Sequence, residues 1–276
     1  VERFDSYLTR YGFGQPTGID LVGEIGGILP SPAAKLKLNK ERWYPGDLVN
    51  AAIGQGMWKV TPLQLARGTA ALADGGMLRR PHLVAAQRTH FDSPWERLPQ
   101  PAPVRITENP ENLRVVQEGM QMTIHGPGGT ARAMSVGAPY RMAGKTGTAQ
   151  VVNRRAQAVN PKSLPLHQRH RALFVGYAPA ENPTIAVAVM VEGGGYGGST
   201  AAPIARKIFD AHLLGKMPEG MEVEGDDAVS APVMVGREIQ VGVPAAVPAS
   251  GTAASTQAAP ASSTPQPAVS VPEPRR

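Results

Sequence analysis

The sequence contains no cysteine among its 276 residues. This absence excludes disulfide bonds, thiolate nucleophiles and cysteine-ligated metal sites. Aromatic residues are scarce at 5%, whereas 31 glycines and 27 prolines predict a chain rich in turns and close backbone contacts. The hydrophobic content of 42% is nevertheless enough for a sizeable core.

Long apolar runs are missing as well. No stretch approaches the ~20 consecutive apolar residues that cross a bilayer. The charged start, residues 1–5, has no apolar segment behind it and does not resemble a signal peptide. Because the first residue is Val1 and not methionine, we expect a processed chain or a fragment.

Negative charge is in short supply, since 22 acidic residues face 28 Lys and Arg for a formal charge of +6. The basic residues are dispersed, and their densest group, within 154–171, lacks interleaved aromatics, which favours a solvated loop over a nucleic-acid site. An anionic polymer of the cell envelope remains a compatible partner. The six histidines have neither metal-ligand spacing nor a Glu-x-x-His partner, so we expect no metal and no cofactor.

Apolar residues at helical spacing predict four helices, with mostly ordered loop over residues 15–50. The clearest helix follows Thr61, where Pro62 occupies the first helical position and Gln64 completes a capping box. The predicted helices span residues 2–11, 61–74, 109–124 and 199–213.

Three short apolar segments bounded by Gly, Pro or Asn predict strands over residues 141–152, 172–178 and 184–191. The turn at 180–183 makes the last two a hairpin, and the third strand, apolar on both faces, is predicted to be central in the sheet. The fold class is therefore α/β of the α+β type, an antiparallel sheet flanked by helices. We expect one domain over residues 1–227 and an Ala/Pro/Ser-rich tail over 228–276, disordered from about residue 243.

One strand carries the most informative chemistry, residues 143–150 with the sequence Ala-Gly-Lys-Thr-Gly-Thr-Ala-Gln. Its small side chains let a ligand backbone lie against the strand and add to the sheet edge. Lys145 supplies a positive charge, the hydroxyls of Thr146 and Thr148 suit a carboxylate, and free N–H groups can polarise a carbonyl. Lys-Thr-Gly alone arises by chance, but the eight-residue pattern in this context is far more specific.

At these residues the chain resembles the transpeptidase domain of class B penicillin-binding proteins, most closely their elongation-type branch typified by penicillin-binding protein 2. The resemblance runs in one order over roughly residues 2–215, which makes coincidence very unlikely. Besides the lysine strand, the matching stretches are residues 11–14, 17–21, 43–47, 53–56, 61–64, 129–131 and 174–179.

The resemblance implies a penicillin-binding and β-lactamase-like fold and serine acyl transfer onto peptidoglycan stem peptides during cell elongation and shape maintenance. Carried over by position, Lys145 and Thr148 are the catalytic residues, with the Thr148 N–H as half of an oxyanion hole. Thr146, Gly147 and Thr148 bind the substrate. The implied partners are stem peptides, β-lactam antibiotics and elongation-complex proteins including a glycosyltransferase, at the periplasmic face of the bacterial inner membrane, with no nucleic acid.

The sequence departs from the family pattern at the nucleophile. None of the eight lysines has a serine three residues before it, and the second motif, Ser-x-Asn or Ser-x-Asp, is also absent. In the family both motifs precede the region matching Val1, together with the first sheet strands and the membrane anchor. We therefore expect an N-terminally truncated domain that is inactive by itself, and whose folding alone is in doubt because a strand edge is exposed.

Two further features leave alternatives open. The loop over residues 53–58 either lines the binding groove, with Gln55, Gly56 and Trp58 as its candidates, or forms a buried turn before the helix. The glycine run at 193–198 lacks the ending of a phosphate-binding loop and is interpreted as a flexible turn. The alternative functions are a β-lactamase or D,D-carboxypeptidase of the same fold, and a non-catalytic module that binds cell-wall peptides.

Overall fold

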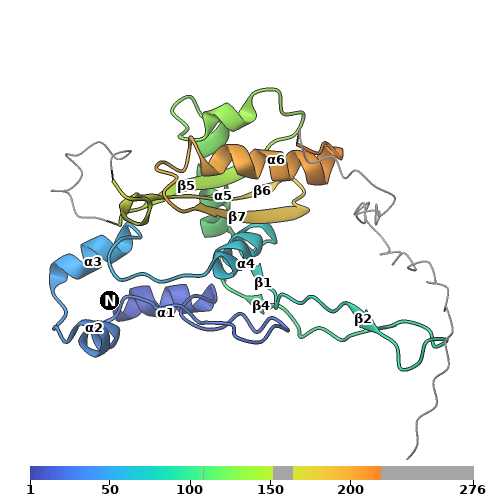
Figure 1. Cartoon of the computed structure of the whole chain (residues 1–276), viewed down its shortest axis with the longest axis horizontal. Helices are drawn as coiled ribbons and strands as arrows, with labels where there is room; N and C mark the ends of the chain where they lie inside the picture. Colours follow the sequence, from blue (N-terminus) through green and yellow to red (C-terminus); the bar gives the residue numbers. More distant parts are fainter. Residues whose placement is uncertain (108, 152–163, 219–276) are drawn as a thin grey trace, which may run out of the picture.

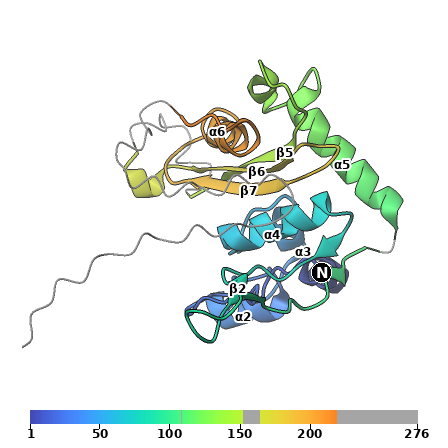
Figure 2. The ribbon, with the colours of Figure 1, turned by 90° about the vertical axis from the view of Figure 1, so that its right-hand side faces the viewer.

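The computed structural model describes residues 1–107, 109–151 and 164–218. A three-stranded antiparallel sheet lies at its centre, with strand order β5 (Ala143–Ala149), β6 (Arg171–Ala178) and β7 (Ile185–Val191). Helix α6 (Ala201–Leu214) covers one face and α4 (Pro62–Ala73) the other, as Figures 1 and 2 show. The predicted tail lies outside the described residues, as does 154–163 of the basic stretch.

Helix α4 begins as its sequence predicts. The Thr61 side chain accepts a hydrogen bond from the Gln64 N–H at 3.1 Å, and Gln64 Oε1 accepts from the Thr61 N–H at 3.0 Å. The buried Gln64 also donates from Nε2 to the carbonyls of Gln15 and Gly26. The capping residue thus also ties the long loop of residues 15–26 to the helix.

The other predicted helices are confirmed. They are α1 (Glu2–Arg10), which ends before Gly12, α5 (Pro110–His125), whose first turn is capped by the Asn109 side chain, and α6. Short 3-10 turns follow at Arg132–Ser135 (η1) and Leu166–Gln168 (η4).

Two short helices were not predicted, α2 (Pro32–Asn39) and α3 (Pro45–Ala52), in the stretch expected to be mostly loop. Each begins with proline at its first helical position, where the missing N–H costs nothing. An ion pair of 2.8 Å between Lys35 Nζ and Asp47 Oδ2 joins them. Eight residues are too few for an apolar period to emerge, which is why the pattern did not reveal these helices.

The predicted strands and hairpin are confirmed, with β6 and β7 in register from Ala172↔Val191 to Ala178↔Ile185. The prediction that 184–191 is the central strand was wrong for the described residues, where β6 is central and β7 lies at the edge. Because α4 and α6 contact both faces of β7, its sequence is apolar throughout. An apolar pattern on both sides of a strand indicates that both of its faces are covered. It does not indicate the position of the strand in the sheet.

Two small ribbons complete the described structure. Strand β1 (Met77–Leu78) pairs with β4 (Val104–Arg105), and β2 (Ala86–Gln87) pairs with β3 (Glu96–Arg97). The second ribbon forms an arm that projects away from the sheet in Figure 1.

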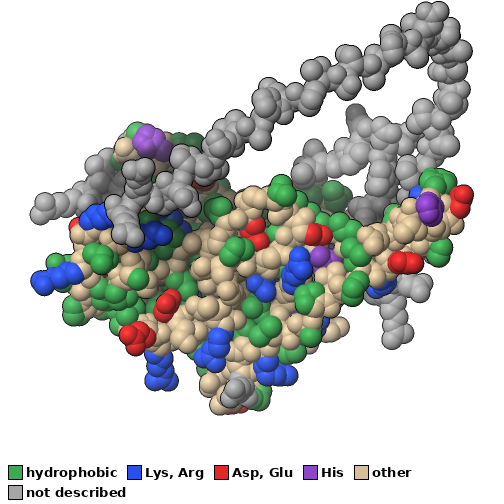
Figure 3. Space-filling view, turned by 90° about the horizontal axis from the view of Figure 1, so that it is seen from below, with side chains coloured by type: hydrophobic (Ala, Val, Ile, Leu, Met, Phe, Trp, Pro, Cys, Tyr) green, Lys and Arg blue, Asp and Glu red, His purple; other side chains and the backbone are tan. Residues whose placement is uncertain are grey.

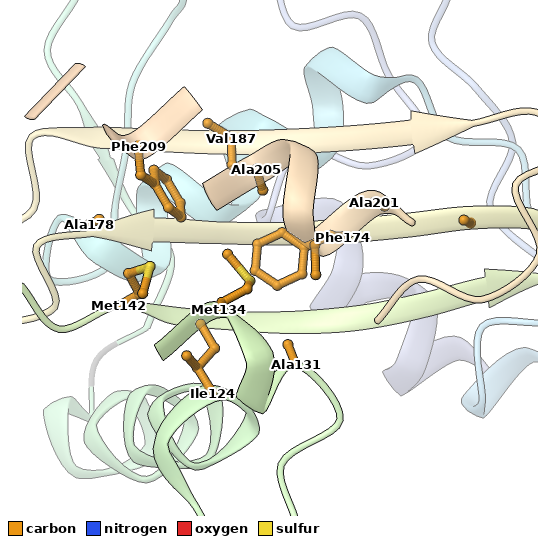
Figure 4. Packing of buried hydrophobic residues seen from close by; sticks show 12 residues of the cluster. Ile124, Ala131, Met134, Met142, Phe174, Ala178, Val187, Ala201, Ala205 and Phe209 are labelled. Atoms are coloured by element: carbon orange, nitrogen blue, oxygen red, sulfur yellow. The ribbon is translucent and has the colours of Figure 1, made fainter. Parts of the chain in front are cut away.

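The main core lies between α6, the sheet and α5, with Phe174 and Phe209 at its centre (Figure 4). The Phe174 ring lies so close to the neighbouring strands that a Cβ atom on Gly144 would sit 2.4 Å from it, and one on Gly176 2.8 Å. The small residues of β5 therefore serve the core as well as any ligand, because they make room for this ring.

Candidate active site

The edge of β5 that faces away from β6 pairs with no other strand in the described part of the chain, and we call it the outer edge. The Thr148 carbonyl on this side accepts a hydrogen bond from Gln55 Nε2 at 2.9 Å, and the Met142 N–H donates to His125 Nε2 at 3.0 Å. In an antiparallel strand the N–H and C=O of one residue point the same way and alternate residues point to opposite sides. The backbone groups of even-numbered residues 142–150, including the Thr148 N–H, therefore face outward.

The side chains of the predicted site residues converge on this edge from both faces. Thr146 and Thr148 lie opposite Phe174 and Ala172 in the register, hence on the α6 face. Lys145 lies on the other face, is exposed, and curls back so that its Nζ donates to the Thr146 carbonyl at 2.9 Å. The ammonium group, the two hydroxyls and the outward N–H groups thus share one accessible edge.

A further hydroxyl, from Thr130, belongs to this arrangement and was not predicted as a site residue. Its Oγ1 lies 2.7 Å from Thr146 Oγ1. The turn after α5 brings it there, and glycine is needed in that turn because a Cβ atom on Gly129 would lie 2.3 Å from the Thr123 carbonyl oxygen. Two sequence signals pointed toward it, a hydroxyl directly after a glycine-rich turn and the family-like stretch of residues 129–131.

The glycine run at 193–198 is a turn, as predicted, but the described residues pack it closely against the site. A Cβ atom on Gly197 would lie 2.2 Å from the Leu173 carbonyl oxygen, and one on Gly198 2.3 Å from that of Thr130. The Thr200 hydroxyl holds the turn by donating to the Gly194 carbonyl at 2.7 Å. Close backbone approach is thus a reason for glycine here, beyond the flexibility that the sequence suggested.

The loop over residues 53–58 was interpreted either as a wall of the binding groove or as a buried turn, and its residues differ in which interpretation they fit. Gln55 reaches β5, whereas Trp58 turns toward the first helix, with its ring edge-on to Phe4 at 5.9 Å and to Phe13 at 6.4 Å. Gln55, Gly56 and Trp58 all border a cavity of about 620 Å³ that Lys35 also lines. Their groove-lining role stays a prediction.

Titratable groups stabilise both the outer edge of β5 and the segment that follows Thr130. Burial, assisted by nearby Arg141, lowers the pKa of His125, which matches its role as a neutral acceptor for the Met142 N–H. Behind Thr130, Arg206 pairs with Asp210 at 2.9 Å and donates to the carbonyls of Met134 and Val136. Burial opposes ionisation of Asp210, but hydrogen bonds from Tyr140 and Arg206 prevail and lower its pKa.

Other kinds of site find no support in the described residues. No group of three or more His, Asp or Glu side chains there is placed to hold a metal ion. Among the helices of that same part of the chain, none is long and apolar enough to cross a membrane. Basic and acidic side chains are interspersed on the face shown in Figure 3, without a patch of one sign.

Comparison with known proteins assigns the chain to a family. The family model described as the penicillin binding protein transpeptidase domain matches residues 1–210. The chain belongs to this family. This match confirms the resemblance to penicillin-binding transpeptidases and the predicted fold class, an antiparallel sheet flanked by helices.

Individual relatives agree with the family. The chain is 38% identical over 216 residues to the peptidoglycan D,D-transpeptidase MrdA of Salmonella typhimurium and 32% identical over 233 residues to MrdA of Escherichia coli K12. These matches cover 78% and 84% of the chain but only 34% and 36% of the relatives. The chain thus spans about a third of the length of these curated relatives.

Solved structures show the same likeness. Pseudomonas aeruginosa PBP2 in complex with WCK 5153 is 41% identical with a TM-score of 0.63, covering 79% of this chain and 46% of that one. Helicobacter pylori PBP2 in complex with MreC is 29% identical with a TM-score of 0.62, covering 78% and 36%. The described fold is therefore that of a penicillin-binding transpeptidase.

Proposed function

We propose that this chain forms one wall of a serine D,D-transpeptidase site that cross-links peptidoglycan stem peptides. The observation that carries the proposal is the outer edge of β5, where the Lys145 ammonium, the threonine hydroxyls and the outward Thr148 N–H meet. Two MrdA relatives, named peptidoglycan D,D-transpeptidases, support the reaction class.

In the proposed reaction the stem peptide lies along β5 with its terminal carboxylate near the hydroxyls of Thr146 and Thr148. A serine oxygen attacks the penultimate D-alanine carbonyl, an ester forms, and the terminal D-alanine leaves with a proton. The Thr148 N–H stabilises the oxyanion, and Lys145 supplies fixed positive charge. An amine of a neighbouring strand then attacks the ester, which forms the cross-link and frees the serine.

The nucleophile of this reaction is not among the 276 residues, since no lysine follows a serine at the required spacing. We infer that a Ser-x-x-Lys motif outside them completes the site, and that these residues alone are inactive. The match to a penicillin-binding protein 3 structure complexed with the β-lactam aztreonam supports β-lactams as partners, and the match to PBP2 in complex with MreC supports elongation-complex proteins. Stem peptides, a glycosyltransferase and a periplasmic location at the inner membrane belong to the same proposal.

Fluorescent penicillin tests the proposal. The gene product that carries this sequence together with a Ser-x-x-Lys motif should form a stable covalent adduct, and Lys145→Met in it should slow acylation at least about a hundredfold, because a fixed charge in the site is lost. Residues 1–276 alone should remain unlabelled. A labelled 276-residue chain, or a longer product that never reacts, would refute the assignment.

The β-lactamase or carboxypeptidase alternative predicts a different time course. A β-lactamase would release the penicilloyl group within seconds, whereas a transpeptidase holds it. A gene product without any Ser-x-x-Lys motif would favour the non-catalytic cell-wall-binding module.

A further inference from the structure

The side-chain amide of Gln55 imitates a short piece of neighbouring strand. Its Nε2 donates to the Thr148 carbonyl at 2.9 Å, and its Oε1 lies 3.5 Å from the Gln150 backbone nitrogen, which donates to it. One amide group thus meets two successive outward groups, the Thr148 carbonyl and the Gln150 N–H just after β5, as the N–H and C=O of one residue in a parallel neighbouring strand would. The contact joins residues 93 positions apart in the sequence.

The loop that presents Gln55 is anchored on both sides. The Gln55 N–H donates to the Asn50 carbonyl at the end of α3, and the Trp58 ring nitrogen donates to the Ala51 carbonyl, both at 2.9 Å. Gly54 and Gly56 have φ values of 74° and 86°, a conformation that favours glycine. Gln55 is therefore held against β5 by a turn with a defined shape.

Thr148 has two outward backbone groups, a carbonyl and an N–H. Its carbonyl is engaged by Gln55, while its N–H faces outward from the same edge. Rotation of the peptide units on either side of a strand residue is limited when one of its groups is fixed, so the Gln55 bond restrains the direction in which the Thr148 N–H points. A carbonyl oxygen has two lone pairs, so a ligand amide can still share this acceptor.

We propose that Gln55 is a positioning residue that holds Thr148 in the orientation needed to stabilise the acyl-transfer oxyanion, and that ends the ligand-accessible part of the β5 edge. This inference rests on the proposed function above and names a residue that acts through Thr148 without touching the reacting atoms. Preorganised donors contribute to catalysis because they need no reorientation during the reaction.

The test compares substitutions in the gene product that contains the nucleophilic serine. Gln55→Glu keeps length and the acceptor for Gln150 but replaces the donor with a carboxylate facing the Thr148 carbonyl, so it should slow penicillin acylation about thirtyfold. Gln55→Ala admits water and should slow it about tenfold. The loss should fall on the first-order acylation step, with the dissociation constant of the non-covalent penicillin complex unchanged.

Gln117→Glu is the matched control, because Gln117 makes the same kind of bond, from Nε2 to the Leu72 carbonyl at 2.6 Å, between α5 and α4. It should acylate at the rate of the unsubstituted protein. A purely structural role for Gln55 predicts the reverse order, with alanine worse than glutamate, and an equal effect in the control.

The outcomes also separate this inference from the proposed function. If the unsubstituted protein is acylated and both Gln55 variants match it in rate, the positioning role is refuted while the function stands. If the unsubstituted protein never forms an adduct, the function itself fails.

Discussion

The Thr146 hydroxyl can donate only one hydrogen bond, because it has a single proton. The neighbouring Thr130 hydroxyl decides which group receives it. A carboxylate only accepts hydrogen bonds, so Thr146 must donate to it in the proposed complex. The Thr130 oxygen, 2.7 Å away, can then donate to Thr146 in turn. Thr130 is thus expected to fix the Thr146 hydroxyl as a donor toward the substrate.

Replacing Thr130 with valine tests this relay with almost no change in shape. Thr130→Val removes the hydroxyl and should slow penicillin acylation about tenfold, the scale of one lost neutral hydrogen bond of ~1.4 kcal/mol. Thr130→Ser keeps the hydroxyl and should stay within about twofold, since the donor is retained. Stopped-flow acylation rates of the two variants decide the matter, and equal rates would dismiss the relay.

His125 makes the β5 edge sensitive to pH. Its folded pKa lies below the unfolded value, so the unfolded chain binds the proton more readily. The stabilisation is complete above the unfolded pKa of about 6.5 and is lost as pH falls through the lower, folded value. Melting temperatures from pH 8 to pH 5 should therefore fall less steeply for His125→Gln than for the native chain; parallel curves would contradict this account.

At the scale of elements, α6 is fastened to the 3-10 turn η1 by the group of Arg206, Asp210 and Tyr140. Asp210 accepts from Tyr140 at 2.6 Å and from Arg206 at 2.9 Å, and Arg206 reaches the carbonyls that follow the Thr130 turn. The side chains of Arg206 and Asp210 are only 17% and 21% exposed. The group therefore supports the wall behind the site.

Removing the carboxylate leaves a largely buried guanidinium and a hydroxyl without their acceptor. Asp210→Ala should lower the free energy of unfolding by about 2 kcal/mol, somewhat less than for a fully buried pair. Asp210→Asn retains an acceptor for Tyr140 and should lose about half as much. Urea denaturation followed by circular dichroism measures both, and a loss in Asp210→Ala below about 0.5 kcal/mol would show that the pair is ordinary surface pairing.

The elements were predictable where local chemistry marks them. The capping box at Thr61 predicted α4, and apolar residues at helical spacing predicted α5. Short apolar runs bounded by turn residues predicted β5 to β7. Strand β5 could be recognised as a candidate site from the sequence, because its candidate residues are consecutive. The sequence marked Gln55 only as a candidate for the groove loop and Thr130 only as part of a family-like stretch. Their contacts with β5 span 93 and 16 positions, and no local pattern encodes them.

At the scale of the whole molecule, the described sheet has two unequal edges. Along β7 the even-numbered residues point their backbone groups outward, because the odd-numbered ones pair with β6. No strand among the described residues covers that edge, and unpaired edges recruit other chains. The 276 residues expressed alone are therefore expected to self-associate through β7.

A charge placed on that edge should oppose the association. Met190 lies on β7 and is 44% exposed, so Met190→Lys is expected to shift the isolated chain toward monomer by light scattering, without unfolding it. Met122→Lys makes the same change at an exposed position on α5 and controls for net charge. Equal shifts in both variants would mean that net charge alone sets the association state.

The other edge carries its own protection. His125 occupies the outward N–H before β5 and Gln55 the outward groups at its end, so a foreign strand can meet only the few residues between them. A long strand from another copy would have to displace both side chains, whereas the short end of a peptide would not. The accessible stretch of the β5 edge is thus long enough for the end of a peptide and too short to pair with a strand of another copy. Self-association of the chain is therefore expected only at the β7 edge, on the opposite side of the sheet.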